Sequence, residues 1–320
     1  MTVHVISVGK SLTDCMETPD QCRALKGKPD LAEQIRTASP HRLVEEFGKK
    51  TGHDASAWLA KALAPEDDPN RDARTADRVT GICAAISPRL WPGGISAEFD
   101  TFDRASGSGR LLNRKDIALL VSSDTAEGLV AGVWNATALT GGDLARVRYL
   151  ADPDDSPTGL RGRAAVVRVP FLDAGDEAGF RQAMRGLGHL GRNLLAHGGI
   201  DAREPFRFYL SGGFKAAIPY LIGLAEGIRS LDPDRDVAAY VLHDTTRAGA
   251  IGLPLRWLIK EKVTGELTGF GTDGTRRDSP PAPRFLEGYA YDKDGRTWRL
   301  TAFGAGLRAL FGLDPEPLVR

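Results

Sequence analysis

The sequence predicts an α/β fold built on a mostly parallel sheet. Short β-branched and apolar runs, such as Val3–Val8 and Phe206–Leu210, alternate with longer amphipathic segments such as Asp176–Ala196. Parallel strands are buried on both faces and therefore appear as continuous apolar runs, whereas helices repeat their apolar residues every three or four positions. This alternation indicates a sheet that is covered by helices on both faces.

The individual elements follow from the same patterns. We expect strands at Val3–Val8, Asp116–Val121, Phe206–Leu210 and Val237–Leu242, with further apolar runs at Ala145–Leu150 and Ala164–Val169. We expect helices at Thr125–Leu139, Asp176–Ala196 and Phe214–Leu231. A long, charged insertion at about 14–92 shows helical spacing at Leu43–Phe47 and Trp58–Leu63. Turn-forming residues predict loops at Pro65–Asp72 and Arg104–Arg110.

The end of the chain has a different character. The proline-rich stretch Ser279–Pro283 indicates a break, and Phe285–Thr301 carries a hairpin signal with Asp292–Gly295 as its turn. Short helices are expected near Leu258–Val263 and at Ala302–Phe311. We therefore divide the chain into a large domain at 1–256, which includes the insertion, and a small winged-helix-like domain at 257–320.

Composition limits the class of protein. Hydrophobic residues make up 42% of the 320 residues, and 42 basic residues balance 42 acidic ones. A protein that holds long nucleic acid usually carries a basic excess, so the balance favours a small ligand. Three cysteines (Cys15, Cys22 and Cys83) argue for a reducing compartment rather than a disulfide framework. With no signal peptide and no apolar run of about 20 residues, we expect a cytoplasmic protein without membrane contact.

Three loops follow predicted parallel strands, at the edge where open α/β sheets bind ligands. They are Gly9–Lys10–Ser11, then Ser122–Ser123–Asp124–Thr125, and Ser211–Gly212–Gly213–Phe214–Lys215. Glycines allow close backbone approach, and free N–H groups at a helix start favour an anion. Lys215 in a first helical turn opposes the helix dipole, which a bound phosphate would justify. Each loop alone also fits a ligand-free role: Asp124 or Thr125 as an N-cap, and Gly212–Gly213 as a tight turn.

These loops carry a resemblance to a known family. Phe208–Leu221 contains Ser-Gly-Gly-Phe-Lys and resembles the "TGGFK" element of CARF (CRISPR-associated Rossmann fold) domains, with serine in place of threonine. Leu120–Gly128 resembles the "SDTxEG" element of the same family, and Ile6–Leu12 its first strand and "GxSL" loop. Ala239–Asp244, followed by Ile251–Leu255, resembles the strand and "LPxLP" segment that close the domain.

The resemblance implies a Rossmann-like domain that forms a homodimer and binds a cyclic oligoadenylate, often cyclic tetra-adenylate, as a messenger of type III CRISPR antiviral defence. A symmetric interface that supplies the same loop twice suits such a ring. The short plan is similar to the CARF-type ring nucleases, which cleave the messenger without metal when a ribose 2′-OH attacks the adjacent phosphate. It implies that Lys215 stabilises the developing charge and that Ser11 positions the hydroxyl or phosphate.

Other assignments stay open. Lys10 adds a cation beside Ser11, and His243 is a candidate acid or base, although a partly buried structural histidine is favoured. No Walker motif and no metal-ligand spacing occur, so we expect neither a metal nor a cofactor. The main alternative is a sensor whose small domain acts on DNA, RNA or a partner, or an effector. Nucleic-acid binding by the small domain is not favoured, because its end is mixed in charge, with Asp314 and Glu316.

Overall fold

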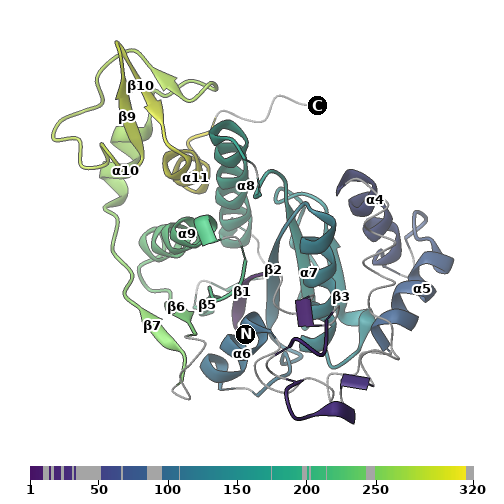
Figure 1. Ribbon diagram of the computed structural model, residues 1–320. Coiled ribbons are helices and arrows are strands. Elements are labelled where there is room, and N and C mark those ends of the chain that lie inside the picture. The colour runs from purple at the N-terminus through teal and green to yellow at the C-terminus, as the bar shows by residue number, and fades with distance from the viewer. Residues whose placement is uncertain are drawn as a thin grey trace.

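The computed structural model (Figure 1) describes most of the chain as a three-layered α/β structure with a smaller unit at its C-terminal end. The residues described are 1–9, 14–15, 18–22, 25–30, 32–33, 52–65, 68–84, 96–107, 109–173, 175–196, 200–201, 203–213, 215–242 and 249–314. The expected helix around Leu43–Phe47 lies outside them, as does most of the insertion before residue 52. Within the described part, no helix is long and apolar enough to cross a membrane.

The central sheet has seven strands in the order β3-β4-β2-β1-β5-β6-β7. Their bounds, in chain order, are β1 Val3–Ser7, β2 Ile117–Ser123, β3 Val147–Leu150, β4 Ala164–Val169, β5 Phe206–Tyr209, β6 Val237–Val241 and β7 Ile251–Leu253. All neighbouring pairs are parallel except β6 and β7, which are antiparallel. The sequence prediction of a mostly parallel α/β sheet is confirmed.

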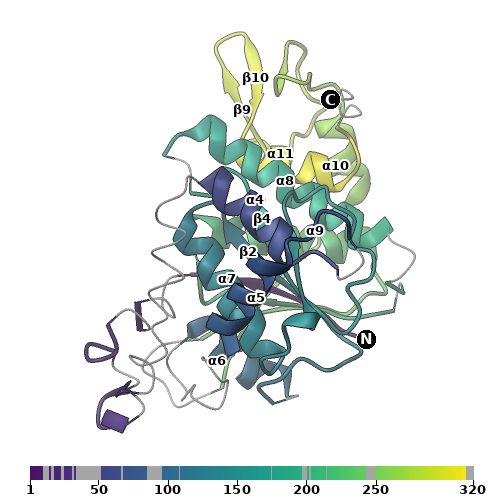
Figure 2. The same ribbon diagram turned by 90° about the vertical axis from the view of Figure 1, so that its right-hand side faces the viewer.

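Helices cover both faces of the sheet (Figures 1 and 2). One face packs against α4 (Gly52–Ala62), α5 (Ala73–Ala84), α6 (Ala97–Ser106) and α7 (Ala126–Leu139), and the other against α8 (Glu177–Ala196) and α9 (Ile218–Leu231). Successive strand residues point to opposite faces, so Ile6 belongs to the first apolar cluster and Val5 to the second. Double-sided burial explains why the strands lack polar alternation.

The C-terminal unit consists of two helices and a small antiparallel sheet. It contains α10 (Lys260–Leu267), β8 (Thr275–Arg276), β9 (Tyr291–Asp294), β10 (Thr297–Leu300) and α11 (Ala302–Leu310), with sheet order β8-β10-β9. Phe270, Tyr291 and Trp298 contribute to a core of its own. Figure 1 shows α11 beside α8, and a Cβ on Gly188 of α8 would collide with the carbonyl of Gly306 in α11. The backbones of α8 and α11 therefore touch, and the unit is packed onto the large sheet's helical layer.

Several boundaries differ from the sequence prediction. The expected loop at Arg104–Arg110 begins inside α6, which ends only at Ser106 because Gly107 follows in the left-handed conformation (φ 65°). The hairpin turns at Gly295–Arg296 rather than at Asp292–Gly295, since Asp292–Asp294 pair with β10. The apolar run from Ala145 starts with a short 3₁₀ turn, Leu144–Arg146, before β3 begins.

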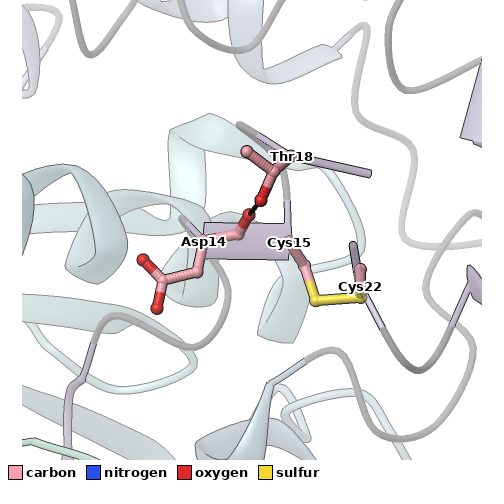
Figure 3. Close-up of a disulfide and its surroundings, with 4 residues drawn as sticks. All are labelled: Asp14, Cys15, Thr18 and Cys22. Atoms are coloured by element: carbon pink, nitrogen blue, oxygen red, sulfur yellow. Dashed lines mark hydrogen bonds between the residues drawn. A yellow bond between two sulfur atoms is a disulfide. The ribbon is translucent and has the colours of Figure 1, made fainter. Parts of the chain in front are cut away.

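Cysteine pairing also differs from the expectation. Cys15 and Cys22 form a disulfide, with Cα atoms 4.8 Å apart (Figure 3). Local backbone hydrogen bonds lie beside it: the N–H groups of Thr18 and Cys22 donate to the carbonyls of Asp14 and Thr18. Cys22 is buried in the first apolar cluster. The small, odd number of cysteines therefore did not predict this bond, because local hydrogen bonds bring Cys15 and Cys22 together.

Candidate functional site

The fold brings the three predicted loops together. They follow β1, β2 and β5, and these strands are direct neighbours in the order β2-β1-β5. The three strands are parallel, so their carboxyl ends meet at one edge of the sheet. The direction in which the chain builds the sheet also reverses at β1. After β1 the chain adds β2, β3 and β4 on one side, and after α8 it returns to the other side of β1 to form β5. Ligands of open α/β sheets bind at such a reversal point.

The loops after β1 and β5 are in direct backbone contact. A Cβ atom on Gly9 would collide with the backbone nitrogen of Gly213. The buried hydroxyl of Ser7, the last residue of β1, donates to the carbonyl of Gly212 at 2.7 Å. Gly213 has a φ of 93°, which glycine adopts without strain. Close packing between these two loops therefore explains why glycine stands at positions 9 and 213.

A buried carboxylate from α6 enters the same place. Glu98 is 1% exposed, and its Oε1 accepts a hydrogen bond from the backbone N–H of Gly9 at 2.5 Å. A Cβ on Gly212 would collide with the Glu98 side chain. Ser96, the N-cap of α6, lies 2.8 Å from Glu98 Oε2 and 2.7 Å from Asn135 Oδ1 of α7. In this structure, the side chain of Glu98 therefore occupies the space beside Gly212 that the absence of a Cβ atom leaves open.

Ser211 links the loop after β5 to two other segments. Its Oγ accepts the backbone N–H of Leu242 at 2.6 Å, and it lies 2.6 Å from the hydroxyl of Thr101 in α6. Leu242 is the last described residue before the segment that contains His243. Ser211 therefore ties the ends of β5 and β6 to α6.

Below these loops, α6 rests on a buried polar pair. His4 Nδ1 of β1 lies 2.9 Å from the hydroxyl of Tyr209 in β5, and Phe102 of α6 packs edge-on against the His4 ring. Burial raises the pKa of Tyr209 well above its ordinary value, so the phenol stays protonated. The buried His4–Tyr209 pair therefore supports α6 through Phe102 and is not part of the exposed loops.

The loop after β2 divides into a buried and an accessible part. Ser122 is fully buried, and a Cβ on Gly132 of α7 would collide with its hydroxyl, so it packs between strand and helix. Ser123 and Thr125 are partly exposed, with hydroxyls 2.9 Å apart, and Thr125 caps α7 by accepting the N–H of Gly128 at 3.1 Å. Of the two N-cap candidates, Thr125 is therefore the cap.

Asp124 connects this loop to the end of β4. Its Oδ2 lies 3.7 Å from the Arg168 guanidinium and accepts the backbone N–H of Phe171 at 3.3 Å. Arg168 is the register partner of Ser122, so its cation belongs to the same sheet edge. Arg168 is a basic residue of the site to which no sequence motif points, because it stands inside an otherwise apolar run.

Lys215 is exposed and starts the 3₁₀ turn Lys215–Ala217, which leads directly into α9. It forms no ion pair with any residue that the structure describes. A cation at this end of a helix lacks the support that the helix dipole gives to anions. The expectation that it stands in the first turn holds for the 3₁₀ turn, while α9 proper begins at Ile218.

Four predicted site residues lie outside the described part of the chain: Lys10, Ser11, Phe214 and His243. The remaining ones, from Gly9 to Lys215, fall on the carboxyl edges of β1, β2 and β5. Among the described residues, no group of three or more His, Cys, Asp or Glu side chains could hold a metal ion. The arrangement offers the partly exposed hydroxyls of Ser123 and Thr125 and the Lys215 and Arg168 cations, which together suit an anionic, hydrogen-bonding ligand.

Comparisons with known proteins add no identification: no family model matches the chain, and no curated protein matches it.

Proposed function

We propose that this chain is a CARF-type receptor for a cyclic oligoadenylate, with cyclic tetra-adenylate as the first candidate. The observation that carries the proposal is the placement of three motif-bearing loops on the adjacent parallel strands β2, β1 and β5, at the reversal point of the sheet. The resemblance of these loops to CARF elements supports the ligand class. Two copies related by a twofold axis would present the loops twice to a cyclic ligand.

For the cleavage reaction, we propose that the attacking group and the phosphate that it attacks both belong to the ligand. A ribose 2′-oxygen attacks the adjacent phosphorus, the bond from phosphorus to the 5′-oxygen breaks, and the products are a 2′,3′-cyclic phosphate and a 5′-hydroxyl. The proton lost from the 2′-hydroxyl is balanced by the one gained at the 5′-oxygen. The exposed Lys215 ammonium would stabilise the charge that grows on the phosphoryl oxygens, and Ser11 would orient the attacking group.

A second candidate is a sensor that binds the ring and leaves it intact. The feature that favours it is the continuity between the site and the C-terminal unit, which we propose to be winged-helix-like. The turn of Lys215 leads into α9, whose Glu226 binds the Arg256 guanidinium at 2.9 Å, and Arg256 also donates to the hydroxyl of Tyr289 in the C-terminal unit at 3.3 Å. Gly223 of α9 packs tightly against Phe303 of α11. A shift of α9 on ligand binding would therefore reach the C-terminal unit.

One assay separates the two. Purified protein is incubated with cyclic tetra-adenylate and cyclic hexa-adenylate in EDTA, the products are resolved by chromatography, and binding of each ring is measured by titration calorimetry. Conversion to linear products that is lost in Lys215→Ala, but kept in the control Lys260→Ala, supports the ring nuclease. Lys260 is also exposed but begins α10 in the C-terminal unit. Binding with an intact ring supports the sensor, and no binding of either ring overturns the proposal.

A further inference from the structure

The turn after β4 places an aromatic residue where the backbone favours glycine. Val169–Leu172 forms a turn closed by the Leu172 N–H and the Val169 carbonyl at 3.3 Å, with Pro170 second and Phe171 third. Phe171 has a φ of 63°, in the left-handed region. The third position of a proline-containing turn with positive φ is normally glycine, because a side chain is strained there. A phenylalanine at this position therefore needs a reason beyond the turn itself.

Packing does not supply that reason. Phe171 is 49% exposed, whereas its neighbours Val169 and Leu172 are buried in the second apolar cluster. A large apolar side chain that is both strained and half exposed contributes little to the core. Residues held in sparsely populated backbone regions cluster at ligand sites.

The strained backbone is tied to the candidate site. The Phe171 N–H donates to Asp124 Oδ2 at 3.3 Å, and Asp124 also pairs with Arg168 at 3.7 Å. Asp124 belongs to the loop after β2, next to the partly exposed hydroxyls of Ser123 and Thr125. Phe171 is thus held at the same carboxyl edge as the three loops, on the next strand outward.

The strand spacing fits a nucleotide that lies across this edge. The order β4-β2-β1 puts the end of β4 two strand spacings, or about 10 Å, from the glycine loop after β1. That separation is comparable with the length of one nucleotide. A phosphate near Gly9 would place a base toward the outer strand.

We propose that Phe171 is a base-stacking residue of this site, on whose ring face an adenine of the ligand lies. The assignment rests on the proposed function and adds which residue recognises the base. An aromatic face accepts any base, and Arg168 and Asp124 beside it can hydrogen bond to the base edge. Removal of one stacked base–aromatic contact lowers affinity by about 5- to 150-fold.

The test measures cyclic tetra-adenylate binding by titration calorimetry for the wild type, Phe171→Gly, Phe171→Trp and a control, Phe285→Ala. Glycine is chosen because it suits the positive φ, so Phe171→Gly should unfold at the wild-type temperature or above. Phe285 is 61% exposed in the C-terminal unit and serves as a matched loss of an exposed ring. We expect Phe171→Gly to lose at least tenfold in affinity, while Phe285→Ala binds like the wild type. In Phe171→Trp, stacking should quench tryptophan emission beyond the change seen in the wild type.

The outcomes are distinguishable. If the wild type binds and a folded Phe171→Gly binds within twofold of it, the stacking assignment is wrong and the proposed function stands. If the wild type binds no cyclic oligoadenylate, the proposed function is wrong and the stacking assignment falls with it. A loss of affinity in Phe171→Gly together with unchanged Phe171→Trp emission would also contradict stacking.

Discussion

Glu98 Oε1 of α6 accepts the backbone N–H of Gly9 at 2.5 Å, which puts a negative charge at the loop where a ligand phosphate is proposed to bind. The carboxylate is buried, and Ser96 lies 2.8 Å from its other oxygen. A phosphate oxygen would compete with this carboxylate for the Gly9 N–H, and two like charges at contact distance repel. Ligand binding at this loop therefore has to displace or neutralise Glu98.

Glu98→Gln is accordingly expected to tighten binding of cyclic tetra-adenylate by about tenfold, because the amide oxygen keeps a hydrogen bond to Gly9 while the charge is removed. Titration calorimetry on both proteins measures the change. The control is Asp103→Asn, which removes the same charge from the same helix at the Arg110 ion pair. An unchanged or weaker affinity in Glu98→Gln would show that Glu98 does not compete with the ligand.

The close packing of Glu98 on Gly212 predicts a stability effect that needs no ligand. Gly212→Ala forces a methyl group into the Glu98 side chain, and overpacking of this kind costs about 1–3 kcal/mol. The free energy of urea-induced unfolding gives the cost, and Glu98→Ala in the same chain should recover part of it. Gly252→Ala is the control, since no atom lies within 4 Å of its Cβ position. Equal effects at positions 212 and 252 would contradict the contact.

The sheet and its helices could be predicted because their signals are local. Continuous apolar runs such as Ala164–Val169 mark strands that are buried on both faces, and β4 has these bounds. The placement of the loops after β1, β2 and β5 at one edge follows from the parallel order of these strands. A reader of the sequence needs only the alternation of strands and helices to expect it.

The contacts that complete the site could not be predicted in this way. Glu98 meets Gly9 across 89 positions, from a segment whose sequence carries no motif. Arg168 sits inside an apolar strand, and the positive φ of Phe171 depends on a turn and on Asp124. The Cys15–Cys22 bond depends on local backbone hydrogen bonds, which spacing alone does not reveal. For Glu98, Arg168 and Phe171, tertiary packing decides, and the local sequence does not record it.

Asp314 gives a stability prediction that depends on pH. Burial alone would raise its pKa, but hydrogen bonds from His189 and Arg185 and the charge of Arg308 hold the pKa below its ordinary value. The carboxylate lies 3.0 Å from His189 Nε2, 2.5 Å from Arg185 Nε and 3.4 Å from Arg308 Nε. A group whose pKa is lowered by folding stabilises the fold above its unfolded pKa, and this contribution is lost as pH falls through the folded pKa.

Asp314→Asn should therefore cost about 2 kcal/mol at neutral pH, because it leaves the buried Arg308 without its carboxylate. The difference from the wild type should begin to shrink below about pH 4, where Asp314 of the unfolded chain takes up a proton, and it should vanish as pH falls through the lower pKa of the folded carboxyl. Urea unfolding at a series of pH values from 7 to 3 measures it. Asp294→Asn removes the exposed pair with Arg299 and should cost under about 1 kcal/mol. A pH-independent cost at position 314 would contradict the assignment.

Glu266 carries the last prediction, for the C-terminal unit. Its buried carboxylate accepts the backbone N–H groups of Phe285 and Leu286 at 2.8 and 2.9 Å and the hydroxyl of Tyr291 at 2.8 Å. Glu266→Ala leaves these donors buried without an acceptor, so the unit should lose about 3 kcal/mol of stability. Glu261→Ala, at an exposed position of the same helix, is the control and should change little. Because α11 packs on α8, we expect a single cooperative transition that shifts to lower urea concentration, followed by circular dichroism and tryptophan emission. Separate transitions for the two probes would show instead that the C-terminal unit unfolds independently of the large sheet.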